Sequence, residues 1–291
     1  MKKHVLLLGS GGMLGHVVNI RLRSLNEYFS VTDIARDSNI VKPDIEMDVT
    51  NFKALQQLYD RIKPDIIINC VGILNANAEN NPTEAILVNS YLPHFLERIT
   101  ANTGSRVIHI STDCVFSGKK GNYSESDFMD SDGYYGRSKA LGEIHNSKDL
   151  TLRTSIVGPE LHSNGIGLFH WFSKQAGIIQ GYSNVFWTGV TTIELSNAIV
   201  ACIIQNITGL FHVVNEIRVS KFDLLQYFKT AFSNSSVTVI EKNYTFHYDK
   251  SLVNTRTDFS YQVPSYEKMM LDMKSWIFQH PQIYSHYKSI L

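Results

Sequence analysis

Short apolar runs alternate with amphipathic segments through the first half of the chain. The runs are rich in valine and isoleucine and only a few residues long, which is typical of strands buried on both faces of a parallel sheet. This pattern predicts strands at residues 4–9, 29–34, 45–49, 65–71, 106–112 and 150–157.

Helical patterns lie between most of these strands. In residues 51–62 the apolar positions are 52, 55, 58, 59 and 62, and Pro64 follows the last of them. That spacing is helical, and a proline ends such a segment. Further helices are predicted at 13–25, 82–103 and 135–146. Alternating strands and helices predict an α/β fold with a doubly wound parallel sheet of the Rossmann type, in which ligands bind at the carboxyl ends of the strands.

The second half of the chain has a less regular pattern. Residues 193–207 and 221–232 are predicted helices, and 209–215 and 237–241 are predicted strands. Glycine, asparagine, serine and aromatic residues crowd 158–192, which indicates loops and a helix over a cleft. We therefore expect a Rossmann domain in residues 1–158. A smaller C-terminal α+β region, residues 159–291, is expected to bind substrate and to be packed on, and partly interleaved with, the first domain.

Composition narrows the functional classes. The chain has 291 residues, with 27 Lys+Arg and 27 Asp+Glu, so no basic surplus indicates a nucleic-acid partner. The apolar run at 198–204 is far shorter than the roughly 20 residues of a membrane span, and the run at 5–8 is too short for a signal peptide. The cysteines Cys70, Cys114 and Cys202 form no CxxC pair, so we expect no metal site, and their usage is typical of a cytoplasmic protein.

A glycine-rich loop joins the first predicted strand to the first helix. Gly9, Gly12 and Gly15 have GxxGxxG spacing. Residues without a Cβ let the backbone approach a pyrophosphate at the start of the helix. Asp33 ends the second strand, where an acidic side chain accepts hydrogen bonds from an adenosine ribose. The context predicts dinucleotide binding.

The choice between NADPH and NADH is open. Asp33 favours NADH, whereas Arg36 matches the 2′-phosphate of NADPH, and we adopt NADPH with NADH as the alternative. Asp48 and Val49 end the third strand and are candidate adenine contacts, although Asp48 also suits the cap of the next helix.

Two further motifs carry acid–base chemistry. Tyr135 and Lys139 form a YxxxK, which places both side chains on one helix face. An ammonium beside a phenol lowers the phenol pKa, so the tyrosine can exchange a proton with an alkoxide. Thr112 follows Ser111 at the end of the fifth strand, where a hydroxyl can polarise a substrate carbonyl.

Together these motifs resemble the extended short-chain dehydrogenase/reductases, and within them the dTDP-4-dehydrorhamnose reductase group. The matching stretches are GSGGMLG (9–15), KPDIIINCVG (63–72), HISTDCVFSG (109–118), YYGRSKALGE (134–143), LRTSIVG (152–158) and GLFHVVN (209–215). The resemblance implies reduction of the C4 ketone of a nucleotide-activated 4-keto-6-deoxyhexose, in the synthesis of deoxysugar and polysaccharide precursors.

The resemblance also implies residue roles. Thr112, Tyr135 and Lys139 would be the catalytic trio. The cofactor would be lined by Gly12, Met13, Leu14, Asp33, Asp48, Val49, Cys70, Val71 and Gly72. Because Cys114 follows Asp113 where the dehydratases of the family carry an Asp-Glu pair, dehydration is disfavoured.

The substrate side departs from the group. Cys114 stands where the dTDP-rhamnose enzymes have tyrosine, and Ile156 where they have tryptophan. The sugar nucleotide can therefore differ, for example a UDP-activated 2-acetamido-dideoxy sugar. Asp113, Cys114, Trp187 and Thr188 are candidate substrate contacts. Arg256 is the candidate diphosphate ligand, because its guanidinium matches phosphate oxygens.

Two rival functions stay open at this point. GDP-fucose synthases resemble this region and use a cysteine at the position of Cys114, so an epimerase or a combined epimerase-reductase is one alternative. A non-catalytic regulatory subunit that binds NADP is the other, and the presence of Thr112, Tyr135 and Lys139 counts against it. The oligomeric state is likewise open, with a homodimer as one candidate.

Overall fold

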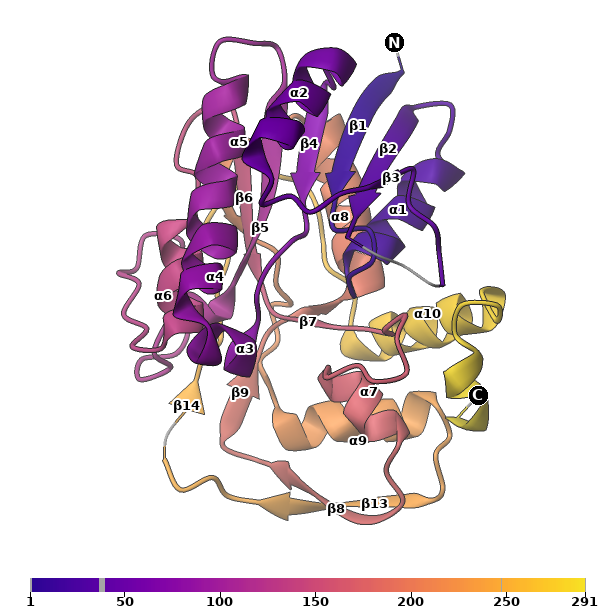
Figure 1. The fold of residues 1–291 in the computed structure, drawn as a ribbon. Helices are drawn as coiled ribbons and strands as arrows, with labels where there is room; N and C mark the ends of the chain where they lie inside the picture. Colours follow the sequence, from indigo (N-terminus) through magenta and orange to yellow (C-terminus); the bar gives the residue numbers. More distant parts are fainter. Residues whose placement is uncertain (1, 37–39, 247, 291) are drawn as a thin grey trace.

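The computed structural model describes residues 2–36, 40–246 and 248–290. Within these residues a parallel sheet of seven strands runs in the order β11-β6-β5-β4-β1-β2-β3 (Figure 1). The predicted Rossmann-type α/β fold is confirmed. The strands of this sheet are β1 (Lys3–Leu8), β2 (Phe29–Ala35), β3 (Ile45–Glu46), β4 (Ile66–Asn69), β5 (Arg106–Thr112), β6 (Leu150–Thr154) and β11 (Gly209–His212).

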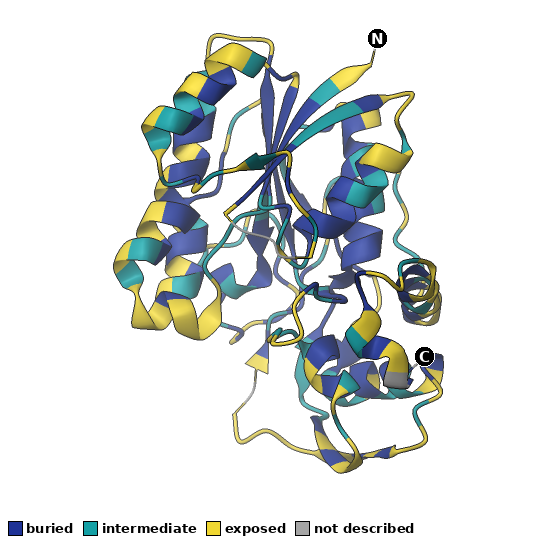
Figure 2. Ribbon diagram, turned by 45° about the vertical axis from the view of Figure 1, so that its right-hand side comes forward, coloured by how far each residue is buried: buried dark blue, intermediate teal, exposed yellow. Residues whose placement is uncertain are grey.

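Helices cover both faces of the sheet because its strands are apolar on both. In β1, Leu6 and Leu8 pack into one cluster and Val5 and Leu7 into another. The first cluster includes side chains from α2 (Phe52–Ile62) and α5 (Leu92–Thr100), and the second from α1 (Gly15–Ser24) and α8 (Thr192–Ile204). Successive residues of a strand point to opposite faces, so a continuous apolar run is what a doubly covered strand requires. Figure 2 shows the central strands as buried.

The long helix predicted at 82–103 is three segments. They are α4 (Pro82–Ala85), the π-helical η1 (Ile86–Tyr91) and α5. Pro93, in the first turn of α5, has no N–H to donate to the Asn89 carbonyl, so the regular helical ladder is interrupted there. Gly142 lies against that carbonyl, and a Cβ at 142 would be 1.8 Å from the Asn89 oxygen. The π-helical turn therefore fits closely against the end of α6 (Tyr134–Leu141).

The second half of the chain adds a smaller lobe of helices and short strands below the sheet (Figure 1). One of its strands, β11, pairs with β6 and so belongs to the central sheet. The helix α10 (Tyr266–Gln279), the last α-helix among the described residues, was not predicted from the sequence. The remaining elements are α3 (Asn75–Asn80), η2 (Asp113–Val115), β7 (Ile156–Val157), α7 (Leu168–Ser173), β8 (Gly177–Tyr182), β9 (Val185–Trp187), β10 (Val190–Thr191), β12 (Val219–Ser220), α9 (Lys221–Ala231), β13 (Val237–Lys242), β14 (Tyr248–Asp249), α10 (Tyr266–Gln279) and η3 (Ser285–Ile290).

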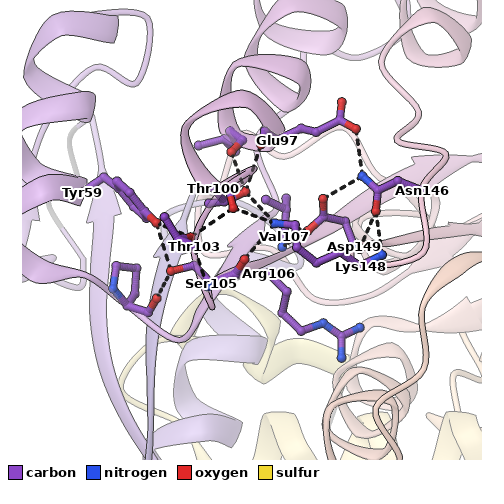
Figure 3. Close-up of polar contacts among 12 residues, drawn as sticks. Tyr59, Glu97, Thr100, Thr103, Ser105, Arg106, Val107, Asn146, Lys148 and Asp149 are labelled. Atoms are coloured by element: carbon purple, nitrogen blue, oxygen red, sulfur yellow. Dashed lines mark hydrogen bonds and ion pairs between the residues drawn. The ribbon is translucent and has the colours of Figure 1, made fainter.

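A polar network closes the amino end of the sheet beside β5 (Figure 3). The Asp149 carboxylate accepts hydrogen bonds from the Val107 N–H at 2.7 Å and the Asn146 amide at 2.8 Å. The Lys148 ammonium donates to the carbonyls of Thr100 and Ser105 at 3.1 and 2.8 Å. Each of these charged groups therefore has its partners within the chain, as buried polar groups require.

Candidate functional site

A pocket of about 290 Å³ opens at the carboxyl ends of β1, β2 and β4. Gly9 adopts φ of +86°, which favours glycine, and a Cβ on Gly15 would lie 2.0 Å from the Gly9 oxygen. No side chain caps the start of α1, where the His16 N–H bonds the Gly12 carbonyl at 3.2 Å, and such an uncapped helix start suits an anion. Residues predicted for the cofactor that line the pocket are Gly9, Gly12, Arg36, Asp48, Val49, Cys70, Val71 and Gly72.

Four predicted cofactor residues do not line this pocket. Met13, Leu14 and Gly15 belong to the loop and the start of α1 beneath it. The expected contact between Asp33 and the cofactor ribose is corrected. The Asp33 side chain is only 3% exposed and forms an ion pair with Arg23 of α1 at 2.8 Å. β2 continues two residues beyond Asp33, so its carboxyl end presents Ala35 and Arg36 to the pocket. The Arg36 side chain is 68% exposed and lies 3.8 Å from Glu84.

A histidine outside every motif supports the glycine loop. His16 Nδ1 lies 2.8 Å from the Gly12 carbonyl, and its Nε2 lies 2.5 Å from the hydroxyl of Tyr284. Burial lowers the pKa of His16 to about 4, so the ring is neutral and bonded at both nitrogens. The C-terminal segment thus holds the loop in place, a long-range contact that no local sequence signal predicts.

Thr112 and Tyr135 meet next to this pocket. Thr112 ends β5, where its hydroxyl accepts a hydrogen bond from the Cys114 N–H at 3.1 Å. Tyr135 is half-buried on α6, and its phenol has the Thr112 hydroxyl as a hydrogen-bonding neighbour. Burial raises the pKa of Tyr135 well above its usual value, and the nearby Cys114 and Asp113 raise it further. The phenol therefore holds its proton, as a proton donor must.

Lys139 lies one turn further along α6 and is buried. Its Nζ donates to the Ile110 carbonyl at 2.6 Å and lies 3.2 Å from Nε2 of His109. Burial lowers the pKa of Lys139 to about 8. In this arrangement the polar contacts of Lys139 are with β5 and burial raises the pKa of Tyr135, so the lowering of the phenol pKa by Lys139 stays a prediction.

Two structural contacts hold α6 in place. The Glu143 carboxylate binds the Arg153 guanidinium through two contacts of 2.7 Å, and Ser111 donates to it at 2.6 Å. Asn89 in the π-helical turn accepts from the Ile73 N–H at 2.8 Å and donates to Ser138 Oγ at 3.0 Å. Asn89 thus joins the pocket wall to the helix that carries Tyr135. Sequence reasoning missed these residues, although buried polar residues in apolar surroundings were a visible signal.

Cys114 and Asp113, the two candidate substrate contacts that follow Thr112, lie near Tyr135. Burial and the Asp113 carboxylate raise the pKa of Cys114 to about 11, so its thiol is neutral at pH 7. Two lysines face this pair electrostatically, Lys221 at the start of α9 and Lys250 after β14. Among the described residues neither has a carboxylate within ion-pair distance, and their ammonium groups lie over the rings of Trp187 and Tyr248 at 5.3 and 5.0 Å.

Two predicted substrate contacts, Trp187 and Thr188, are corrected. Trp187 is 2% exposed and packs against Tyr266, with ring centroids 5.6 Å apart. The hydroxyl of Thr188, which is also buried, accepts a hydrogen bond from the Leu252 N–H at 2.9 Å. Both side chains are therefore committed to the protein core. Their aromatic and small polar character, which motivated the prediction, stabilises packing instead.

Arg256 lies at the wrong end of the sheet to bind a diphosphate. Its guanidinium donates to the carbonyls of Thr208 and Leu210 at 2.5 and 3.0 Å, and it is paired with Asp258. These carbonyls flank Gly209, the first residue of β11. Since β11 is parallel to the other strands, its start lies opposite the ligand-binding edge.

Within the part of the chain that the structure describes, no group of histidine, cysteine, aspartate and glutamate side chains could hold a metal ion. In the same residues no helix has both the length and the apolar character needed to cross a membrane. The three cysteines are free thiols.

Comparison with known proteins relates this geometry to a family. The family model described as RmlD substrate binding domain matches residues 2–244. A dTDP-4-dehydrorhamnose reductase of Aggregatibacter actinomycetemcomitans is 31% identical over 181 residues, which cover 60% of this chain and 58% of the relative. A dTDP-4-keto-6-deoxy-D-glucose reductase of Streptomyces niveus is 26% identical, with 75% of each chain covered.

A solved structure extends the likeness to the whole fold. The dTDP-4-dehydrorhamnose reductase of Bacillus anthracis str. Ames, in complex with NADP, superposes with a TM-score of 0.81 at 23% identity, covering 95% of this chain and 100% of the other. Because the family model spans both the sheet and most of the smaller lobe, the match is not confined to one half. The chain therefore belongs to the family that the RmlD substrate binding domain model describes.

Proposed function

We propose that the protein is an NADPH-dependent reductase acting on the C4 ketone of a nucleotide-activated 4-keto-6-deoxy sugar. The observation that carries the proposal is the adjacency of a proton donor and a dinucleotide-type pocket. Ile73 lines the pocket, and the Asn89 side chain bonds both the Ile73 N–H at 2.8 Å and Ser138 Oγ at 3.0 Å, on the helix α6 that carries Tyr135. Relatives named as dTDP-sugar reductases support the substrate class.

The residues at the pocket fit a dinucleotide. The close approach of Gly15 to Gly9 leaves no room for a Cβ, and the uncapped start of α1 suits a pyrophosphate. Ala35 and Arg36 at the end of β2 favour NADPH, because Arg36 can bind a 2′-phosphate while Asp33 is engaged by Arg23. This reverses the sequence argument that Asp33 favours NADH.

The mechanism assigns one role to each residue of the trio. When bound, the reduced nicotinamide supplies the hydride that reaches C4 of the sugar. Tyr135 donates its phenolic proton to the sugar oxygen, for which its raised pKa keeps it protonated. Thr112, whose hydroxyl donates to Asp113 Oδ1 at 3.1 Å in the structure, would turn that hydrogen bond to the same oxygen, and Lys139 would supply positive charge when the phenol has lost its proton. The assignment rests on the Thr112–Tyr135 contact and on the position of Lys139 on the same helix.

The epimerase alternative needs a carbon acid–base pair that the site does not favour. Removing a carbon-bound proton requires a thiolate, and the pKa of Cys114 is raised to about 11. Epimerisation also requires a second acid–base group on the opposite face of the sugar. Two histidines, His162 and His170, are within reach by sequence for that group. His170 is buried and bonded through Nδ1 to the hydroxyl of Tyr287 at 2.7 Å, whereas His162 lines the dinucleotide pocket.

A direct assay tests the function. The purified protein is incubated with NADPH and a panel of dTDP- and UDP-activated 4-keto sugars, and NADPH consumption and product are followed. We expect reduction of at least one member of the panel, with no solvent deuterium at C3 or C5 in D₂O. Deuterium that enters wild type and is lost in Cys114→Ser would favour the epimerase. Tight NADPH binding without turnover of any sugar would favour the regulatory subunit. The three free thiols support a reducing compartment, and we place the enzyme in the cytoplasm.

A further inference from the structure

A chain of buried polar side chains runs beneath the proposed active site. Asn69 ends β4 and is opposite His109 in the neighbouring strand β5. The Asn69 amide nitrogen lies 3.2 Å from Nδ1 of His109, and Nε2 of the same ring lies 3.2 Å from the Lys139 amine. Asn69 and His109 have no exposed surface, so every polar atom of these two side chains must have its hydrogen-bonding partner inside the protein.

The orientation of the Asn69 amide fixes the tautomer of His109. The Val71 N–H donates to the Asn69 oxygen at 3.1 Å, so the NH₂ group must face the ring. A flipped amide would set two donors against each other at Val71. Because the NH₂ group can only donate hydrogen bonds, Nδ1 of His109 must be the acceptor. A neutral imidazole then carries its proton on Nε2.

The Nε2 proton points at the amine of Lys139. A neutral amine has a lone pair that accepts this hydrogen bond while one of its own hydrogens is donated to the Ile110 carbonyl at 2.6 Å. An ammonium has no lone pair, so two donors would meet across 3.2 Å. Moving the ring proton to Nδ1 relieves that conflict and creates another at Asn69. All partners are satisfied only when Lys139 is neutral.

We propose that Asn69 and His109 are positioning residues that oppose protonation of Lys139 and so make its charge a switch within the working pH range of the enzyme. This inference rests on the proposed function. The contacts of Asn69 also connect with the cofactor pocket, because Val71, whose N–H orients Asn69, lines that pocket.

Other charges near the switch are accounted for. Glu143, just after α6, and Cys70, after β4, both favour the ammonium, but the Glu143 carboxylate is neutralised by Arg153. His94 on α5 acts on the ring of His109. Burial lowers the pKa of His109 well below its usual value, in agreement with a neutral ring. As pH rises, Lys139 loses its proton, the positive charge beside the spent phenolate disappears, and turnover should fall.

The first test uses the wild-type protein without substrate. Nitrogen-15 NMR reports the tautomer of His109 and the titration of the Lys139 amine. We expect the Nε2–H tautomer and a lysine midpoint well below the ordinary value of about 10.4. Finding the Nδ1–H tautomer, or an ordinary midpoint, overturns the inference while leaving the reductase function untouched. This arm needs no variant, so it decides the question even if substitutions at these sites prevent folding.

The second test changes the acceptor. In His109→Gln the side-chain oxygen can lie where Nε2 lies and accept from an ammonium, so the Lys139 midpoint should rise by about one pH unit or more, a tenfold gain in proton affinity. His4→Gln at the start of β1 is the matched control, since the His4 ring bonds Thr32 and is not among the groups that act on His109 or Lys139, and the Lys139 midpoint should stay at the wild-type value. An unchanged midpoint in His109→Gln overturns the inference.

The third test concerns turnover. The alkaline limb of the kcat profile should move upward in His109→Gln by the same interval as the NMR midpoint, with little change in KM. A limb that stays in place while the NMR midpoint moves would separate the lysine charge from catalysis and overturn the switch. If no sugar is reduced at any pH, the proposed function fails, while the NMR result on the Asn69–His109–Lys139 chain stands by itself.

Discussion

The two ends of the central sheet are built from the same strands but treat their polar groups differently. At the amino end, Asp149 and Lys148 have their hydrogen-bonding partners within the chain (Figure 3). At the carboxyl end, Lys221 and Lys250 lack carboxylate partners among the described residues, and the Tyr135 phenol is held protonated by burial. Satisfied groups stabilise the fold, and charged groups at the carboxyl end that have no carboxylate partner are ones that a ligand can meet.

The comparison predicts that the stability of the fold and the catalytic activity depend on opposite ends of the sheet. Substitutions at the amino end should change the free energy of unfolding and leave the rate per folded molecule alone. Those at the carboxyl end should do the reverse, because catalytic sites are held in arrangements that do not maximise stability.

Tyr135→Phe should produce the largest effect. The ring is kept but the transferable proton is lost, so kcat should fall about 10²-fold or more, the range expected for a general acid. The Kd for NADPH and the unfolding midpoint should stay near wild type. Steady-state kinetics and NADPH titration measure both quantities. Near-normal turnover would remove Tyr135 from the mechanism.

Asp149→Ala should give the largest loss of stability. It leaves the Val107 N–H and the Asn146 amide without their buried acceptor, which should cost about 3 kcal/mol of unfolding free energy. Urea denaturation measures the loss, and active-site titration gives kcat per folded molecule, which should be unchanged. Asp60→Ala, at an exposed carboxylate on α2, is the control and should lie within about 0.5 kcal/mol of wild type. A matching drop in kcat would break the separation between the two ends.

Arg36→Ala should have an intermediate effect confined to the cofactor. Loss of a charge-assisted hydrogen bond to the 2′-phosphate is worth about 1.5–3 kcal/mol, so the preference for NADPH over NADH should fall by roughly 10- to 100-fold. The ratio of kcat/KM for the two cofactors measures it. Arg61→Ala, on the exposed surface of α2, should leave that ratio alone. If Arg36→Ala also leaves that ratio unchanged, another residue binds the 2′-phosphate.

Arg256→Ala should have the smallest effect on function. Because this side chain binds carbonyls at the amino end of β11, the KM for the nucleotide sugar should be unchanged. A loss of about 1 kcal/mol in unfolding free energy is expected from the missing hydrogen bonds. A severalfold rise in KM with wild-type stability would return Arg256 to the substrate site.

The comparison also explains what the sequence could predict. The apolar runs, the glycine loop and the Tyr135–Lys139 spacing are local patterns, and the fold and the positions of the loop followed from them. Asp33 was misassigned because the strand continues to Ala35, and two residues decide which side chain reaches the pocket. Arg256 was misassigned because no local signal tells at which end of β11 the segment after residue 250 crosses the sheet.

His109 illustrates a different limit. A histidine inside an apolar strand is visible in the sequence, and burial of a polar group requires a partner. The partners, Asn69 and Lys139, come from another strand and from a helix, so their identity depends on strand order. Pairing across a parallel sheet is set by the whole chain and not by any one segment.

The placement of β11 limits how the two halves of such chains can be exchanged between related proteins. A fragment that stops at residue 158 contains six strands of the central sheet but leaves β6 as an uncovered edge, open to pairing with other molecules. The half that would bind substrate therefore also completes the half that would bind cofactor. New sugar specificities in this architecture must come from altered loops within one continuous chain, because exchanging whole modules at the apparent boundary would cut through the sheet.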